Sequence, residues 1–177
     1  MGGTIRATSQ LGKESRFSFS IVLSPALTST ITPEFSPTAL PKLSQLRVLV
    51  VEDNLINQMV ISGLLRKLGI TPRITSSGAE ALDVVRESHH ELDVILMDCE
   101  MPIMDGYQAT RAIRLLEQHL NQKPLPIIAL TAHALPEHRE ACFAAGMTGY
   151  LSKPLILSAL TSMLSAYLPA DSMAASH

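Results

Sequence analysis

The chain has few aromatic residues, little net charge and few cysteines, and each shortage excludes a class of function. Tryptophan is absent and aromatic residues make up 4% of the 177 residues, so a platform for stacking nucleic-acid bases is not expected. The formal net charge of -2 gives no electrostatic reason for nucleic acid to be a partner. The two cysteines, Cys99 and Cys142, form neither a CxxC zinc pair nor a disulfide framework, and we expect reduced thiols in the cytoplasm.

Long apolar runs are also missing. No stretch approaches the roughly 18 consecutive apolar residues of a membrane-spanning helix, and no continuous apolar core follows the basic residues near the N-terminus, as a signal peptide requires. We therefore expect a cytoplasmic segment without membrane contact, whether or not a longer parent protein is anchored in the inner membrane. A hydrophobic content of 46% is enough for one globular domain with some chain left over.

The chain divides into four predicted parts. In residues 1–24, alternating apolar residues at 17–23 and a turn at Gly12-Lys13 predict a β-hairpin with Thr4–Thr8. A lone hairpin is marginal in water, so this part resembles the edge of a larger domain. Residues 25–45 are predicted to be a linker, because prolines recur among serines and threonines. Residues 46–168 are the main domain and 169–177 a tail.

The main domain alternates between short apolar runs and helical patterns. The first helix is predicted from an apolar stripe and ends at Gly69, and a capping box at Ser77–Glu80 opens the second. Three more helices are predicted, from Gly106 to Gln118, from Pro136 to Gly146, and from Leu157 to a stop at Pro169. The stripe of the first helix consists of Ile56, Val60, Leu64 and Leu68. Five strands alternating with five helices predict an α/β fold with a doubly wound parallel sheet.

Polar residues follow four of the predicted strands at the point where each strand ends. Glu52 and Asp53 follow residues 46–51, and Asp98 follows 92–97. Thr131 and Lys153 follow 126–130 and 148–152. Acids and lysines at strand ends are ordinarily solvated surface residues. In an open parallel sheet, however, the C-terminal strand ends line one crevice, so we expect these five side chains to converge there.

This combination of groups suits a divalent cation and a phosphoryl group. Three carboxylates within a few ångströms repel one another, and a hard cation such as Mg²⁺ relieves the repulsion. The Lys153 ammonium and the Thr131 hydroxyl can contact phosphoryl oxygens, and a carboxylate can act as a nucleophile toward phosphorus. A Walker-type glycine loop is absent, so a nucleotide is not the obvious phosphate source. Glu100 stands where a haloacid-dehalogenase-type phosphatase has the second Asp of Asp-x-Asp, which disfavours that class.

Residues 46–168 resemble the receiver domain of two-component response regulators. The matching motifs are Val-Glu-Asp-Asn at 51–54, Met-Asp-Cys-Glu-Met-Pro-Ile-Met-Asp-Gly at 97–106, Ala-Leu-Thr-Ala at 129–132 and Tyr-Leu-Ser-Lys-Pro at 150–154. The resemblance implies a flavodoxin-like fold with Asp98 as the phospho-acceptor. It implies Mg²⁺ as the cofactor, held by Glu52, Asp53, Asp98 and the backbone carbonyl of Glu100.

The same resemblance assigns roles around the site. Thr131 becomes a switch hydroxyl, and Lys153 a phosphate counterion before a cis Pro154. Tyr150 becomes an aromatic side chain that turns inward from an exposed position, although an ordinary core or edge tyrosine is a rival interpretation.

Residues 52–58 and 101–106 are most similar to receivers fused to hybrid sensor histidine kinases. Residues 1–24 resemble the last two strands of the kinase ATP-binding domain, with Glu14 where that family usually has Gly, and without its nucleotide-binding boxes. The implied function is to accept a phosphoryl group from phosphohistidine of the parent kinase core onto Asp98 and relay it to a histidine phosphotransfer domain. On its own this chain would be no kinase, with only phosphoryl transfer and autodephosphorylation at Asp98. The alternatives are a Mg²⁺-dependent phosphatase with an aspartyl-phosphate intermediate and a stand-alone single-domain response regulator.

Overall fold

The computed structural model describes residues 3–10, 12, 14–21, 43–132 and 136–168. It divides into two units, residues 1–33 and 34–177, which are described separately. Except for residues 43–45, the predicted linker lies outside the described residues, as does the predicted tail. Within the described ranges, no helix combines the length and the apolar character that crossing a membrane requires.

The first unit contains the predicted hairpin. Strands β1 (Gly3–Gln10) and β2 (Glu14–Ile21) pair antiparallel, and Gly12 in the turn has a φ of 77°, which glycine adopts without strain. The alternation of apolar residues predicted one buried face. Within this unit that face is absent from the described side chains, since Ile5 is 80% exposed and Phe17 is 73% exposed.

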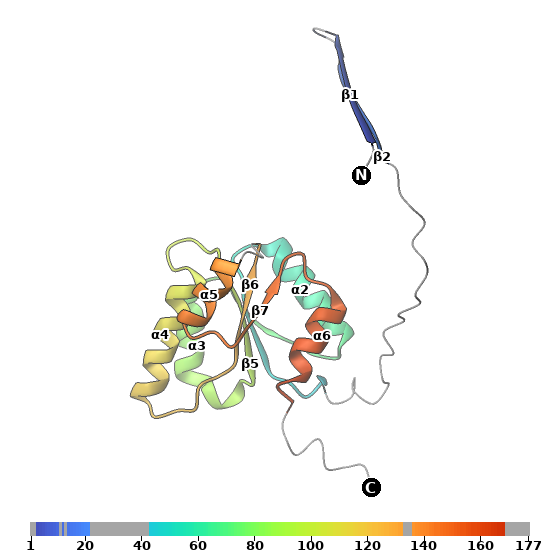
Figure 1. Ribbon diagram of the computed structural model, residues 1–177. Helices are drawn as coiled ribbons and strands as arrows, with labels where there is room; N and C mark the ends of the chain where they lie inside the picture. Colours follow the sequence, from blue (N-terminus) through green and yellow to red (C-terminus); the bar gives the residue numbers. More distant parts are fainter. Residues whose placement is uncertain (1–2, 11, 13, 22–42, 133–135, 169–177) are drawn as a thin grey trace. The chain divides into compact units, whose positions relative to one another are not determined.

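The second unit is built around one parallel sheet (Figure 1). Its strands are β3 (Val48–Val51), β4 (Arg73–Thr75), β5 (Val94–Asp98), β6 (Ile127–Thr131) and β7 (Gly149–Ser152), in the spatial order β4-β3-β5-β6-β7. The predicted doubly wound sheet is confirmed. The chain runs from β3 outward to β4 and then returns to β5 on the other side of β3. Ligands of such sheets bind at this reversal.

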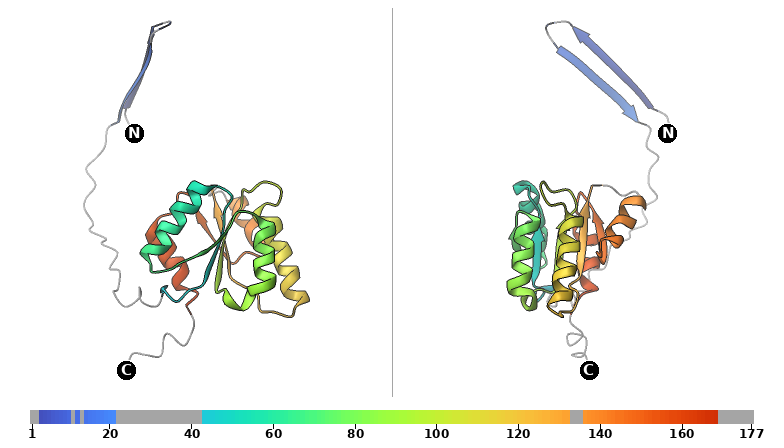
Figure 2. Two further views of the ribbon diagram at one scale, coloured as in Figure 1. Left: turned by 180° about the vertical axis from the view of Figure 1, so that it is seen from behind. Right: turned by 90° about the vertical axis from the view of Figure 1, so that its left-hand side faces the viewer.

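Helices cover both faces of the sheet (Figure 2). The helices are α2 (Leu55–Lys67), α3 (Gly78–Ser88), α4 (Gly106–His119), α5 (Pro136–Ala144) and α6 (Leu157–Ser165), with a 3₁₀ turn at His89–Glu91. One core lies between the sheet and α3, α4 and α5, and the other between the sheet and α2 and α6. Successive residues of β3 alternate between them, with Leu49 in the first core and Val50 in the second.

The helix boundaries confirm the predicted starts and stops, with one exception. Ser77 caps α3 by accepting a hydrogen bond from the Glu80 backbone N–H at 3.2 Å, and Gly69, with a φ of 78°, follows the end of α2. The last helix ends at Ser165 and not at Pro169. Beyond it, the Tyr167 backbone N–H donates to the Leu164 carbonyl three residues earlier, which tightens the turn and ends the α-helix.

The predicted apolar stripe of the first helix is buried only in its second half, where Leu68 is 2% exposed and Leu64 packs against the core. In α2, Ile56 is 71% exposed and Val60 is 52% exposed. The buried residues of this helix are Gln58, Ile61, Ser62 and Leu65. The apolar pattern misplaces the first half of this face because two of the four buried side chains are polar, and the Gln58 amide is buried with hydrogen-bond partners. The first half of the helix therefore exposes an apolar stripe beside the C-terminal edge of the sheet, formed by Leu55, Ile56, Met59 and Val60.

Candidate functional site

Three carboxylates meet at the C-terminal edge of the sheet, where the strand order reverses. Glu52 directly follows β3, and Asp98 is the last residue of the neighbouring strand β5. One oxygen each of Glu52, Asp53 and Asp98 lies within 4.8 Å of the other two. Glu52 and Asp98 are buried and Asp53 is exposed. The predicted convergence of these acids is thus present.

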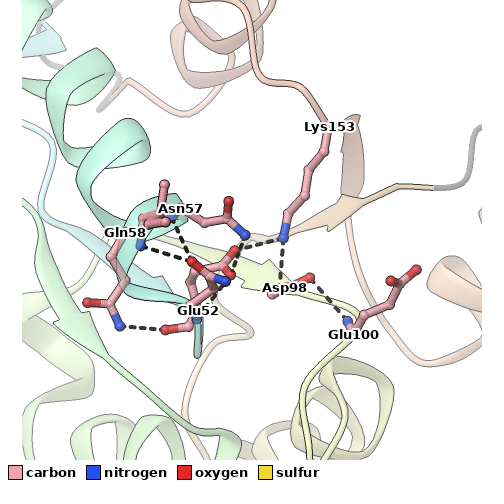
Figure 3. Close-up of polar contacts among 8 residues, drawn as sticks. Glu52, Asn57, Gln58, Asp98, Glu100 and Lys153 are labelled. Carbon is pink, nitrogen blue, oxygen red and sulfur yellow. Dashed lines mark hydrogen bonds and ion pairs between the residues drawn. The ribbon is translucent and has the colours of Figure 1, made fainter. Parts of the chain in front are cut away.

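A single ammonium group bridges two of the carboxylates. Lys153 follows β7, and its Nζ lies 2.7 Å from Glu52 Oε2 and 2.8 Å from Asp98 Oδ2 (Figure 3). Its backbone N–H donates to the Thr131 carbonyl at 2.8 Å, which ties the end of β7 to the end of β6. The peptide bond between Lys153 and Pro154 is cis, as the resemblance implied.

Burial and charge oppose each other in the titration of this cluster. Burial raises the pKa of Asp98, and the Glu52 charge adds to that rise, while hydrogen bonds from Lys153 and from the Glu100 backbone N–H only partly offset it. Burial alone would lower the pKa of Lys153, but its hydrogen bonds to Asp98 and Glu52 raise it overall. One ammonium against three carboxylates leaves excess negative charge among oxygen ligands, which fits Mg²⁺.

The loop after β5 holds Asp98 in place. Asp98 Oδ1 accepts a hydrogen bond from the Glu100 backbone N–H at 3.1 Å. Asp105 caps α4 by accepting from the Gln108 N–H at 2.7 Å. A Cβ atom at Gly106 would lie 2.1 Å from the Asp98 carbonyl oxygen, so only glycine allows the start of α4 to approach the strand end this closely. The Asp-Gly pair therefore positions the candidate nucleophile.

Thr131 and Tyr150 lie where a change at Asp98 could reach the helices. Thr131 is buried at the end of β6, the strand next to β5. Tyr150 is half-buried, packs against the core, and its ring lies 5.4 Å from the Arg139 guanidinium carbon; the expected exposed position is not observed. Arg139 also lies 5.7 Å from the centroid of the Phe143 ring.

Two amide side chains that the sequence analysis gave no individual role contact Glu52. Asn57 Nδ2 donates to Glu52 Oε1 at 2.8 Å. Gln58 Nε2 donates to the Glu52 carbonyl at 2.7 Å and to Ser76 Oγ at 3.2 Å. The available signal was the Asn54-x-x-Asn57 spacing, which places one asparagine at the cap of α2 and the other in its first turn.

Known proteins resemble this chain in both sequence and structure. A profile of the response regulator receiver domain matches residues 48–165. The chain is 40% identical over 117 residues to hybrid signal transduction histidine kinase M of Dictyostelium discoideum, covering 66% of this chain and 5% of that protein. It is 37% identical over 158 residues to histidine kinase 5 of Arabidopsis thaliana, covering 76% of this chain and 17% of that protein. The chain therefore spans less than a fifth of the length of these relatives.

Solved structures include two informative matches. The receiver domain of Ssk1, crystallised with the histidine phosphotransfer protein Ypd1 of Saccharomyces cerevisiae, matches with a TM-score of 0.67 and 30% identity over 74% of this chain and 94% of that chain. The receiver domain of the Arabidopsis thaliana histidine kinase CKI1, complexed with Mg²⁺ and BeF₃⁻, matches with a TM-score of 0.64 and 36% identity over 73% of this chain and 95% of that chain.

Proposed function

This chain belongs to the response regulator receiver family, and on that premise we propose that it accepts a phosphoryl group on Asp98 from a phosphohistidine and relays it to a histidine phosphotransfer domain. The observation that carries the proposal is the Lys153 ammonium, which contacts a buried Asp98 inside a cluster of carboxylates. The crystallised complex between Ssk1 and Ypd1 supports a phosphotransfer protein as the partner.

The chain's own groups can perform the transfer. An Asp98 carboxylate oxygen forms a bond to phosphorus while the bond from phosphorus to the histidine nitrogen breaks. The imidazole keeps the electron pair and takes a proton from solvent, and Lys153 neutralises a phosphoryl oxygen. Glu52, Asp53, Asp98 and the Glu100 carbonyl would hold Mg²⁺, which supplies positive charge beside the phosphoryl oxygens when it is bound. The CKI1 receiver complexed with Mg²⁺ and BeF₃⁻ supports this assignment.

The exposed stripe of α2 is the surface on which we expect the phosphotransfer domain to dock. Its apolar residues lie on the helix that begins beside Glu52, and Ile156, 59% exposed, lies shortly after Lys153. The exposed members on the helix are Leu55, Ile56, Met59 and Val60. A cleft of about 180 Å³ that is lined by Val60, Lys153 and Pro154 joins the stripe to the site. Exposed apolar patches of this kind mark protein interaction sites.

Phosphorylation is proposed to act on the face formed by α5, β7 and α6 through Thr131 and Tyr150. The Thr131 hydroxyl donates a hydrogen bond to a phosphoryl oxygen, worth about 1.5–3 kcal/mol. This bond moves the end of β6 toward Asp98. Tyr150 then turns further inward, away from Arg139. Thr131→Ala should retain phosphate uptake and lose this coupling. Amide NMR with a stable phosphate mimic and Mg²⁺ tests it, because equal shifts over residues 136–160 in both proteins would contradict the coupling.

We propose that the N-terminal unit, like the matched relatives, belongs to a histidine kinase. Hairpin β1–β2 would be the end of a kinase ATP-binding domain, where exposed Ile5 and Phe17 could pack against further strands. The parent would then be a hybrid histidine kinase whose receiver lies in the cytoplasm.

Stoichiometry with acetyl phosphate and Mg²⁺ tests the proposed function against the phosphatase alternative. A receiver should gain one phosphoryl group per chain by intact mass and release inorganic phosphate slowly. A phosphatase should release many phosphates per chain at a steady rate without accumulating the phosphorylated form, and that result would contradict the proposal.

A further inference from the structure

The Glu52 carboxylate is held at both oxygens. It is fully buried. Oε1 accepts hydrogen bonds from Asn57 Nδ2 at 2.8 Å and from the Asn54 backbone N–H at 3.3 Å, while Oε2 contacts Lys153 Nζ at 2.7 Å (Figure 3). One oxygen is thus occupied by the start of α2, and the other is directed at Lys153.

Local helix chemistry creates this arrangement. Asn54 is the N-cap of α2, because its side chain accepts from the backbone N–H groups of Ile56 and Asn57. Asn57 is therefore the third helical residue, from which a capping-box side chain ordinarily reaches back to the N–H of the cap. In this protein Glu52 accepts from that N–H, and Asn57 donates to the same carboxylate oxygen. The positive end of the helix also favours a carboxylate at this place.

Gln58 fixes the main chain of the same residue. Its Nε2 donates to the Glu52 carbonyl at 2.7 Å and to Ser76 Oγ at 3.2 Å, so one buried amide joins the loops that follow β3 and β4. The Glu52 backbone is thereby anchored independently of its side chain. Removing the Asn57 amide should then disturb the direction of the carboxylate without moving the loop.

If Lys153 neutralises the phosphoryl group, Glu52 loses its ion-pair partner when Asp98 is phosphorylated. In the structure the ammonium contacts Glu52 and Asp98 together. If Lys153 turns to a phosphoryl oxygen on Asp98, Glu52 Oε2 loses its ion pair, and only the contacts to Oε1 still orient the carboxylate. A neutral amide suits this task, because it orients the carboxylate without adding a positive charge that would compete with a cation.

We propose that Asn57 is a positioning residue of the cation site, which keeps Glu52 Oε2 directed at the carboxylate cluster when Lys153 leaves it. The inference rests on the proposed function, since it assumes a cation at the cluster and a phosphoryl group on Asp98. It goes beyond that function by assigning a role to a side chain that is not itself a member of the cluster.

The test is a Mg²⁺ titration in the presence of a stable phosphate mimic, monitored by amide NMR, on three proteins: the unaltered chain, Asn57→Ala and a control, Gln118→Ala. The control removes an exposed amide from α4. Asn57→Ala should weaken Mg²⁺ binding by about tenfold, the usual loss when a hydrogen-bond partner of a ligand is removed. Phosphate uptake from acetyl phosphate by Asn57→Ala should accordingly require more Mg²⁺ than uptake by the unaltered chain. Gln118→Ala should change neither.

Its outcomes separate the two proposals. The side-chain NH₂ signals of Asn57, identified by their loss in Asn57→Ala, should also shift when Mg²⁺ is added to the unaltered chain. Equal Mg²⁺ affinity of Asn57→Ala and Gln118→Ala would overturn the positioning role while the unaltered chain still takes up phosphate. Failure of the unaltered chain to take up phosphate would instead overturn the proposed function.

Discussion

Carboxylates are in excess at one edge of the sheet and are paired with arginines at the other. At the C-terminal edge, three carboxylates share one ammonium from Lys153. At the N-terminal edge, each of two acids has its own arginine: Asp93 pairs with Arg47, and Glu117 pairs with Arg114. Matched charges stabilise a fold, whereas an excess of one sign costs stability unless a ligand of opposite charge binds. The difference therefore assigns structure to one edge and function to the other.

The most deeply buried pair of the N-terminal edge connects three elements. Glu117, whose side chain is 1% exposed, accepts from Arg114 Nη1 at 2.6 Å and from the Leu125 backbone N–H at 2.7 Å. Arg114 also donates to the carbonyls of Leu125 and Gly146, at 2.8 and 3.0 Å. The pair thus fastens α4 to the segments that lead into β6 and β7.

Breaking this pair should give the largest change in stability. Arg114→Ala leaves the buried Glu117 without its arginine, with the Leu125 backbone N–H and His89, 3.4 Å away and charged only if protonated, beside it. We expect the free energy of unfolding to fall by about 3 kcal/mol. Urea unfolding followed by circular dichroism measures it. Arg111→Ala, the same substitution at an exposed position of α4, should stay within about 0.5 kcal/mol of the unaltered chain. Equal losses of stability in the two variants would show that the Arg114–Glu117 pair does not stabilise the fold.

Removing a carboxylate at the C-terminal edge should raise the free energy of unfolding instead of lowering it. In metal-free buffer, Asp53→Ala should raise the free energy of unfolding by about 1 kcal/mol, because it relieves repulsion within the cluster. With Mg²⁺ the unaltered chain should gain stability and Asp53→Ala should gain less. Thermal unfolding with and without Mg²⁺ tests both effects. Glu87→Ala, which removes an exposed carboxylate of α3, should respond to Mg²⁺ as the unaltered chain does. If Asp53→Ala gained as much stability from Mg²⁺ as Glu87→Ala, the cation would have to bind elsewhere.

The smallest expected effect is the pH dependence of the Arg47–Asp93 pair. Hydrogen bonds from Arg47 lower the pKa of Asp93, with burial opposing them. The stability that the pair contributes is present above the unfolded pKa of Asp, about 3.9, and disappears as the pH falls through the lower folded value. Because the Arg47 side chain is 51% exposed, its contribution should be at most about 1 kcal/mol.

Unfolding at a series of pH values measures this contribution. Arg47→Ala should be less stable than the unaltered chain at pH 7, and the difference should shrink once Asp93 is protonated in both, to what the Arg47 hydrogen bond to the His90 carbonyl contributes. Asp93→Asn should lack this pH dependence. A difference between Arg47→Ala and the unaltered chain that stays constant down to low pH would show that the arginine does not act through Asp93.

The sequence alone predicted the sheet and the convergence of the acids, because strand ends in a parallel sheet are fixed by topology. Glu52, Asp98 and Lys153 directly follow or end their strands, so no side-chain detail was needed to bring them together. The strand β4 was counted but not located, since it has only three residues and two of them are exposed.

Two features that the sequence did not indicate, the buried polar side of α2 and the ion pair of α4, share a physical cause. The buried face of α2 includes Gln58, and the N-terminal edge depends on Arg114 and Glu117 on α4. Each is a polar side chain whose burial depends on partners distant in the sequence, such as Ser76 for Gln58 and Gly146 for Arg114. An apolar pattern assigns such residues to the surface. Hydrogen-bond partners of this kind become visible only when the fold has brought the segments together.

Intact-mass measurement of Asp98→Asn beside the unaltered chain tests the central claim most directly, after both have been incubated with acetyl phosphate and Mg²⁺. The amide is nearly isosteric with the carboxylate but cannot act as the nucleophile, so the fold should be retained. The unaltered chain should gain the mass of one phosphoryl group, and Asp98→Asn should gain none. An undiminished gain in Asp98→Asn would contradict the assignment of Asp98 as the phospho-acceptor.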